Sequence, residues 1–256
     1  MLNTLESTQQ RLAELEQLLQ KRTEELAEAR RDLTNLGYSV SHDLRAPLRH
    51  LNGYLQIMGE DWAEAMEPAC RACLGKVQSA SRELGEMLDA LLELSRLDRQ
   101  ELHCQRVALQ DLARSAVSGL NGASSGRHID WKIGFLPVSH CDPSLVRKLF
   151  LILLSNALKF TRPRNPAVIE IGTMDQEGRQ VVFVRDNGVG FDMRFTDKLF
   201  LLFHRLHSRQ EYEGLAVGLA IGQRILAKHG GRMWAEAAVG EGATFYFVLD
   251  GKQAGG

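Results

Sequence analysis

The sequence has no apolar run long enough to cross a membrane and almost no net charge. No stretch reaches the roughly 18 apolar residues of a transmembrane helix, and no signal peptide opens the chain. The formal charge of -1 gives no electrostatic reason to expect nucleic acid or an anionic membrane as a main partner. We therefore expect a cytoplasmic protein with no membrane segment and no nucleic-acid partner.

Cysteine is too scarce for a disulfide scaffold, because a chain of 256 residues contains four. Cys70 and Cys73 form a CxxC pair, but it lies in a helical pattern with no second pair nearby. Buried or idle thiols are therefore favoured over a zinc or redox site. The hydrophobic fraction of 44% and the charged fraction of 25% are typical of soluble globular proteins.

The most regular pattern is a seven-residue leucine repeat at the N-terminus. We call its members the heptad leucines: Leu5, Leu12, Leu19, Leu26 and Leu33. Polar residues fill most of the other positions, and neither Gly nor Pro occurs before Gly37. Residues 1–35 are therefore predicted to form a coiled coil with a partner, and a solvated single helix is the alternative.

Two amphipathic helices follow, separated by a break around residues 59–68. The first is predicted over residues 38–59 and the second from Pro68 to about Leu102. A lone helical hairpin buries little apolar surface. Residues 36–104 are therefore expected to complete a four-helix bundle with a second copy of the chain, as a homodimer.

The pattern changes near residue 105, where strands begin to mix with helices. Strands are predicted at 129–135, 167–174, 180–186, 232–238 and 243–250, and helices at 109–119, 142–161 and 217–229. Several strands are neighbours in the sequence, which favours antiparallel pairing. Residues 105–251 therefore predict an α/β sandwich with a mostly antiparallel sheet, followed by a short tail at 252–256.

A histidine in the first amphipathic helix is a candidate nucleophile. His42 lies about 200° around the helix from both Val40 and Leu44, so it points away from the apolar seam. Asp43 can accept the imidazole proton or orient the ring, which suits a nitrogen that attacks phosphorus. Pro47 removes a backbone donor and bends the helix nearby. These residues alone favour an ordinary exposed histidine as much as a functional one.

An amide interrupts the apolar stripe of the helix predicted at 142–161. Asn156 must be hydrogen-bonded or bind something, and its oxygen suits Mg²⁺. Lys159, one turn further along, suits phosphate. A frayed helix end is the alternative reading of this pair.

Two glycine-bearing segments follow the amide. In "DNGVG", Asp186 ends a strand, and Gly188 and Gly190 allow close backbone approach to a flat ligand. The second segment, "GLAVGLAIGQRI", leads into a helix whose N-terminal amides could face phosphates. Each glycine loop is weak evidence alone, and their order along the chain is the stronger signal.

In this order, the segments resemble the transmitter module of a sensor histidine kinase. "SHDLRAPL" looks like the phosphoacceptor box, "LLSNALKFT" like the N box and "DNGVG" like the first glycine box. "KLFLLFHRLH" resembles the phenylalanine box, "GLAVGLAIGQRI" the second glycine box and "GEGATFYF" the closing strand. The likeness covers residues 36–250 and is closest to kinases that follow phytochrome, PAS or GAF sensors.

The resemblance implies a fold and an activity. The fold would be a coiled coil and a dimeric helical bundle, followed by the Bergerat-type ATP-binding sandwich shared with type II topoisomerases and heat-shock chaperones. With ATP and Mg²⁺ the protein would phosphorylate His42 and pass the phosphate to an aspartate on the receiver domain of a response regulator. Residues 1–35 resemble the signalling helix that links a kinase to an upstream sensor, and this chain contains no such sensor.

The resemblance also assigns roles by position. His42 would be the phosphoacceptor, with Asp43 as its acid/base partner, and Asn156 would hold Mg²⁺. The other nucleotide-binding residues would be Lys159 (a phosphate), Asp186 (the adenine amino group), Gly188 and Gly190 (pocket shape), Arg205 (the γ-phosphate), Gly214 and Gly218 (borders of the ATP lid) and Thr244 (the adenine side).

Three departures from the family pattern leave other functions open. Ile152 stands where relatives carry a second Asn, Leu215-Ala216 replaces Thr-Gly, and Ala46 replaces the Thr or Asn of many phosphatase-competent members. A weakened kinase homologue, acting mainly as a response-regulator phosphatase or a dimeric scaffold, is the first alternative. A chaperone-like or serine-kinase ATPase is the second, although neither needs an exposed histidine on a bundle helix.

Overall fold

The computed structural model describes residues 2–62, 64–120, 126–206, 212 and 214–249. The predicted tail at 252–256 and the end of the last predicted strand lie outside this part of the chain. The chain divides into two compact units, Met1–Arg99 and Gln100–Gly256, and each is described by itself.

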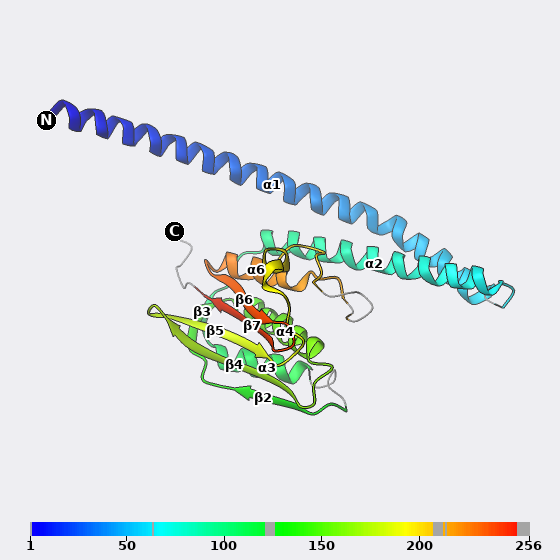
Figure 1. The fold of residues 1–256 in the computed structure, drawn as a ribbon. Helices are drawn as coiled ribbons and strands as arrows, with labels where there is room; N and C mark the ends of the chain where they lie inside the picture. Colours follow the sequence, from blue (N-terminus) through cyan, green and yellow to red (C-terminus); the bar gives the residue numbers. More distant parts are fainter. Residues whose placement is uncertain (1, 63, 121–125, 207–211, 213, 250–256) are drawn as a thin grey trace. The chain divides into compact units, whose positions relative to one another are not determined.

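The first unit is a helical hairpin. Helix α1 (Leu2–Asp61) runs without interruption through Gly37 and Pro47, and α2 (Pro68–Arg99) returns alongside it (Figure 1). Pro68 occupies the first position of α2, where its missing N–H has no helical partner to lose. The predicted break between the two helices is confirmed.

One row of side chains packs the two helices together, with a period of seven residues. Its buried members are Ser41, Leu48 and Leu55 on α1 and Leu74, Ser81, Leu88 and Ser95 on α2. A second apolar row stays 43% to 48% exposed, and we call it the outer row: Leu44, Leu51, Met58, Val77 and Leu84. The described heptad leucines, from Leu12 to Leu33, are 54% to 71% exposed, and the side chain of Leu5 lies outside the described residues. The hairpin by itself therefore leaves two apolar stripes uncovered.

The second unit is built on a five-stranded sheet in the order β2-β4-β5-β7-β6. The strands are β2 (Ile129–Ile133), β4 (Ala167–Gln176), β5 (Arg179–Asp186), β7 (Gly242–Val248) and β6 (Arg232–Ala238). Only the β2–β4 pair is parallel among these neighbours. The prediction of a mostly antiparallel sheet is confirmed. A small second sheet pairs β1 (Gln105–Ala108) with β3 (Val138–Cys141), and neither was predicted because four residues show no clear period.

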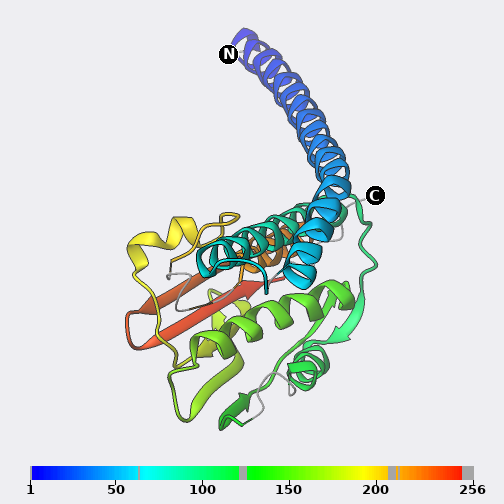
Figure 2. The same cartoon turned by 90° about the vertical axis from the view of Figure 1, so that its right-hand side faces the viewer.

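Helices α3 (Leu109–Leu120), α4 (Pro143–Phe160) and α6 (Gly218–Lys228) cover one face of the large sheet (Figure 1 and Figure 2). The core between the layers centres on Phe150 of α4, whose ring meets Phe247 of β7 edge-on at 5.7 Å. The short helices η2 (Met193–Phe195) and α5 (Thr196–Leu199) follow β5. The predicted fold class, a helical N-terminal region followed by an α/β sheet domain, is confirmed.

Two observations bear on function classes considered from the sequence. No helix in the described part of the chain is both long and apolar enough to span a bilayer. Cys70 and Cys73 are exposed free thiols on α2, and the described residues contain no group of three or more His, Cys, Asp or Glu side chains that could hold a metal ion. A zinc site at the CxxC pair therefore has no further ligands among these residues.

Candidate active site

The candidate nucleophile lies on the outer surface of the first unit. The His42 side chain is 67% exposed on α1, and its Nδ1 lies 3.2 Å from Oδ1 of Asp43. In the neutral form of the ring, a hydrogen bond to the Asp43 carboxylate favours the tautomer with its proton on Nδ1 and the lone pair on Nε2. This tautomer presents a neutral nucleophilic nitrogen to solvent.

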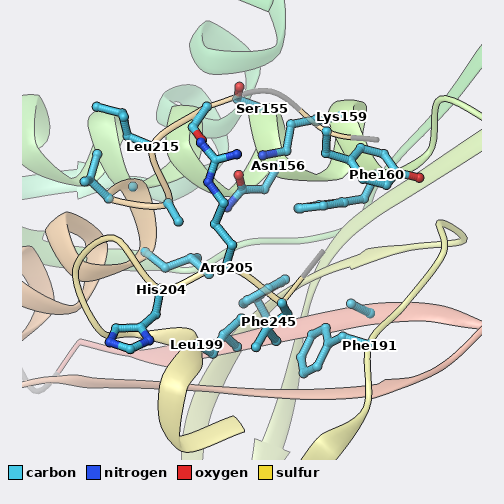
Figure 3. A pocket seen from close by; sticks show the side chains of 18 of the residues that line it. Ser155, Asn156, Lys159, Phe160, Phe191, Leu199, His204, Arg205, Leu215 and Phe245 are labelled. Atoms are coloured by element: carbon cyan, nitrogen blue, oxygen red, sulfur yellow. The ribbon is translucent and has the colours of Figure 1, made fainter. Parts of the chain in front are cut away.

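In the second unit, a cavity of about 300 Å³ is lined by α4, the segment before α6, and the ends of β5 and β7 (Figure 3). Seven residues with predicted roles line it: Asn156, Lys159, Asp186, Gly190, Arg205, Gly214 and Gly218. These residues are far apart in the sequence, and the fold brings them to one place. The cavity is large enough for part of a nucleotide and falls at the lower end of the range for small-molecule sites.

The capped start of α4 helps to place two of these side chains. Asp142 is the N-cap, and its Oδ1 accepts hydrogen bonds from the backbone amides of Ser144 at 3.0 Å and Leu145 at 3.2 Å. The apolar face of α4 is buried along its length, which fixes the helix rotation. Asn156 and Lys159 consequently point into the cavity from its last turns.

One end of the cavity holds a buried carboxylate. Asp186 ends β5 and is 5% exposed, and its Oδ1 accepts a hydrogen bond from the Gly188 amide at 2.8 Å. Burial raises the pKa of this carboxyl to about 6, with the amides of Gly188 and Ala243 opposing the rise. The rings of Phe191 and Phe245 line the same cavity (Figure 3). A flat, aromatic ligand with an exocyclic amino group fits these partners.

The backbone comes unusually close to this end of the cavity at one glycine. Gly190 has a φ of 61°, and a Cβ at this position would lie 1.9 Å from the carbonyl oxygen of Ala238. No side chain fits there without moving the β6–β7 turn. The prediction that a glycine allows close backbone approach here therefore has a steric basis.

The other end of the cavity carries facing cations. Figure 3 shows Arg205 extending toward Asn156 and Lys159. Desolvation lowers the pKa of Lys159, and the positive charges of Arg205 and Arg162 lower it further. Arg205 donates from Nη2 to the Gly214 carbonyl, while its buried Nη1 has no hydrogen-bond partner in the described part of the chain. Two positive charges that face each other repel, and a bound anion such as phosphate would neutralise them and accept a hydrogen bond from Nη1 of Arg205.

Asn156 is the one predicted metal ligand, and its surroundings are compatible with Mg²⁺. Its amide lines the cavity beside Lys159, at the cationic end. Mg²⁺ in phosphate sites is commonly held by one or two protein oxygens, with phosphate oxygens and waters completing the octahedron. A single amide oxygen therefore fits a metal that arrives with its phosphates.

Two predicted residues do not line the cavity. Gly188 is not among the lining residues, and its backbone amide instead donates a hydrogen bond to the carboxylate of Asp186. Thr244 lies between the lining residues Ala243 and Phe245 on β7, and successive side chains of a strand alternate between faces. Its hydroxyl accepts a hydrogen bond from Nε of Arg185 at 3.2 Å instead. The structure therefore does not bring the Thr244 side chain to the nucleotide side.

Most of the apolar lining was not predicted. Phe160, Phe191, Leu199, Tyr212 and Phe245 all contribute. The Phe160 and Tyr212 rings, from α4 and the segment before α6, lie 5.0 Å apart between centroids. In the sequence these aromatic residues look like ordinary core positions, so nothing local separates them from the buried core.

Three of the residues that depart from the family pattern lie where α4 meets the segment before α6, and the fourth, Ala46, is on α1 in the first unit. Ala216 has a φ of 55°, a left-handed conformation that costs a residue with a Cβ roughly 1–2 kcal/mol. Leu215 lines the cavity where relatives carry a hydroxyl. Ile152 packs against the first residue of α6, because a Cβ on Gly218 would lie 3.1 Å from its Cγ2. These three side chains make this border of the cavity apolar.

The fold and the cavity define a nucleotide-binding sandwich preceded by a helical hairpin that exposes a histidine. Residues 141–253 match the family described as histidine kinase-, DNA gyrase B-, and HSP90-like ATPase. Residues 32–100 match the His Kinase A (phospho-acceptor) domain. The chain therefore carries the two domains of a histidine kinase transmitter module, in the order predicted from the sequence.

Curated relatives include phytochromes. The chain is 33% identical over 228 residues to cyanobacterial phytochrome B of Nostoc sp. The matched region covers 88% of this chain and 30% of the relative. It is 30% identical over 239 residues to the phytochrome-like protein Cph1 of Synechocystis sp., covering 91% of this chain and 32% of the relative. The chain thus spans about a third of the length of these relatives.

Among solved structures, the chain is similar to full-length ShkA in complex with AMPPNP. The TM-score is 0.58 at 23% identity, over 83% of this chain and 45% of the other. This likeness supports the fold.

Proposed function

We propose that this chain uses ATP to phosphorylate its own His42 and then passes the phosphate to an aspartate on the receiver domain of a response regulator. The observation that carries the proposal is the cationic end of the cavity, where Lys159 faces Arg205 and the buried Nη1 of Arg205 has no hydrogen-bond partner among the described residues. A triphosphate satisfies that donor and neutralises both cations. An exposed histidine in the same chain supplies the acceptor.

The site residues divide the work of the reaction. Ionised Asp186 accepts a hydrogen bond from the adenine amino group, and Lys159 and Arg205 bind the phosphate chain. Mg²⁺, held by Asn156, would neutralise charge on the phosphates. Nε2 of His42 forms a bond to the γ-phosphorus as the bond from that phosphorus to the bridging oxygen breaks and ADP leaves. Asp43 takes the Nδ1 proton, which leaves the imidazole ring uncharged and the negative charge on the transferred phosphoryl group.

We also propose a homodimer as the working assembly. The outer row on α1 and α2 supplies an apolar seam for a second hairpin, and the heptad leucines supply one for a second N-terminal helix. In this arrangement residues 1–35 act as a coiled-coil signalling helix, 36–104 as the dimerisation and phosphotransfer hairpin and 105–251 as the catalytic domain, with 252–256 as a tail. A phytochrome, PAS or GAF sensor would act upstream, and the assembly would be cytoplasmic.

The test is labelling of the purified chain with γ-radiolabelled ATP and Mg²⁺. Phosphoramidate on His42 should be acid-labile and alkali-stable, and His42→Gln should abolish it. His50→Gln is the matched control, because His50 is also exposed on α1. Labelling that persists in His42→Gln, or that survives acid, would contradict the assignment.

Two observations favour the alternative of a weakened kinase that works mainly as a phosphatase or scaffold. Ala216 is held at positive φ at the border of the lid, and Ile152 offers no oxygen near the metal. Both changes affect positioning of the phosphates and leave the adenine end intact. Incubating phosphorylated regulator with the chain and ADP separates the two functions by the direction of net phosphate flow.

A further inference from the structure

An aromatic ring lies against the candidate phosphoacceptor. Tyr38 precedes His42 by four residues on α1, so the two side chains are neighbours on one helix face. Their ring centroids are 6.2 Å apart and their planes differ by 22°, a stacked arrangement. The His42 ring thus contacts Tyr38 through its face and Asp43 through its Nδ1 edge.

The tyrosine is in turn held by a cation from the other helix. The guanidinium carbon of Arg99 lies 4.1 Å from the centroid of the Tyr38 ring, well within cation–π range. Arg99 is the last residue of α2, and its Nη2 donates to Oγ of the buried Ser95 at 2.9 Å. The three side chains therefore form a connected set, which we call the Arg99–Tyr38–His42 stack.

This arrangement restricts a side chain that would otherwise rotate freely. An exposed imidazole on a helix samples several rotamers, and only some of them direct Nε2 outward. Contact with Tyr38 limits the tilt of the ring, and the hydrogen bond to Asp43 limits its rotation. Nε2 is the ring nitrogen left available.

We propose that Tyr38, held by Arg99, is a positioning residue that fixes the ring plane of His42 for phosphoryl transfer. This inference rests on the proposed function of His42. Tyr38 touches the histidine and takes no part in the chemistry. Because Arg99 ends α2, the orientation of the nucleophile depends on the last turn of that helix being intact.

The stack has a spectroscopic signature that does not depend on activity. A ring above an imidazole shifts its carbon-bound protons upfield, so Tyr38→Leu should move the His42 proton signals downfield in the full chain labelled at histidine. Tyr38→Phe keeps the ring and should keep the shift. His42→Gln assigns the signals, and those of His50 should stay unchanged in every variant. Unchanged His42 shifts in Tyr38→Leu would overturn the stack.

The kinetic test separates positioning from binding. At saturating Mg-ATP, Tyr38→Leu should lower the initial rate of His42 labelling about tenfold, since small misplacements of a reacting group cost this much or more. The dissociation constant for ADP should stay within about twofold of the parent value, and Tyr38→Phe should restore the rate.

Arg99→Gln should lower the rate less than Tyr38→Leu, because the ring stays but loses its support. A rate for Tyr38→Leu equal to that of the parent would overturn the positioning role, provided that thermal melts show both chains folded. Absence of labelling in the parent chain would instead overturn the proposed function, and the histidine shifts would still decide whether the stack exists.

Discussion

Replacing Asp186 with Asn should stabilise the empty catalytic unit and weaken its binding of nucleotide. The carboxylate is 5% exposed at the end of β5 and its pKa is raised to about 6 by burial. An ionised acid in this place is costly for the fold, because no basic side chain among the described residues offsets its desolvation. Asn keeps the shape and can still accept the Gly188 amide proton.

The size of the stability effect follows from linkage. The pKa rises from 3.8 unfolded to about 6 folded, a difference that corresponds to about 3 kcal/mol at 1.36 kcal/mol per unit. Between these two pH values the folded chain binds more protons than the unfolded chain, so stability falls as pH rises through this window. The penalty is absent below pH 3.8 and complete above pH 6.

At pH 7.5 the free energy of unfolding of the variant should therefore be higher by up to about 3 kcal/mol. The amide nitrogen of Asn reduces this gain, because it is buried without a hydrogen-bond acceptor. For a unit of this size, a net gain of about 1–2 kcal/mol raises the melting temperature by roughly 2–8 °C. At pH 5 the gain should be about 1.4 kcal/mol smaller, because the parent carboxyl is then largely protonated.

Nucleotide affinity should move in the opposite direction. Loss of a charge-assisted hydrogen bond to the adenine amino group costs about 1.5–3 kcal/mol, which is roughly tenfold to a hundredfold in the dissociation constant. Calorimetric titration with ADP measures this, and scanning calorimetry at pH 7.5 and pH 5 measures the stability.

The matched control is Asp175→Asn. Asp175 also accepts a hydrogen bond from a glycine amide, that of Gly178 at 3.0 Å, but its side chain is exposed near the end of β4. Replacing Asp175 should change the free energy of unfolding and the free energy of ADP binding by no more than about 0.5 kcal/mol each. An unchanged ADP affinity in Asp186→Asn would refute the adenine assignment, and an unchanged melting temperature at both pH values would refute the burial argument.

The chain should sediment at about twice 28.6 kDa at micromolar concentration. Polar replacement of the three middle heptad leucines should loosen the N-terminal helices while the outer row keeps the dimer, and a monomeric parent would contradict both seams. The triple change Ile152→Asn, Leu215→Thr and Ala216→Gly should raise the initial labelling rate at saturating Mg-ATP with little effect on ADP affinity. It would supply an oxygen near the proposed Mg²⁺ and a hydroxyl near the proposed phosphates, and Gly would adopt the positive φ at 216 without strain. A rate no higher than that of the parent would show that the lid tolerates these residues.

The long, strongly periodic elements were predictable from the sequence. The helices around His42 and Asn156 and all five strands of the large sheet were assigned within a few residues, because the apolar period is a local property of the chain. The two four-residue strands, β1 and β3, were missed because pairing with each other defines them, and pairing is not local. The order of the kinase-like motifs pointed to the nucleotide site before any contact was known.

What the sequence by itself determined was which residues carry chemistry: a histidine off the apolar seam, an amide in an apolar stripe and a carboxylate at a strand end. Only the tertiary structure decided which of them meet. Because successive side chains of β7 alternate between its two faces, Thr244 points away from the cavity. The fold also places Arg205 opposite Lys159, and it brings Arg99 of α2 over the ring of Tyr38. The chemistry of a side chain is set by the residue itself. Burial, facing charges and ring contacts depend on segments distant in the sequence, and folding is what brings these segments together.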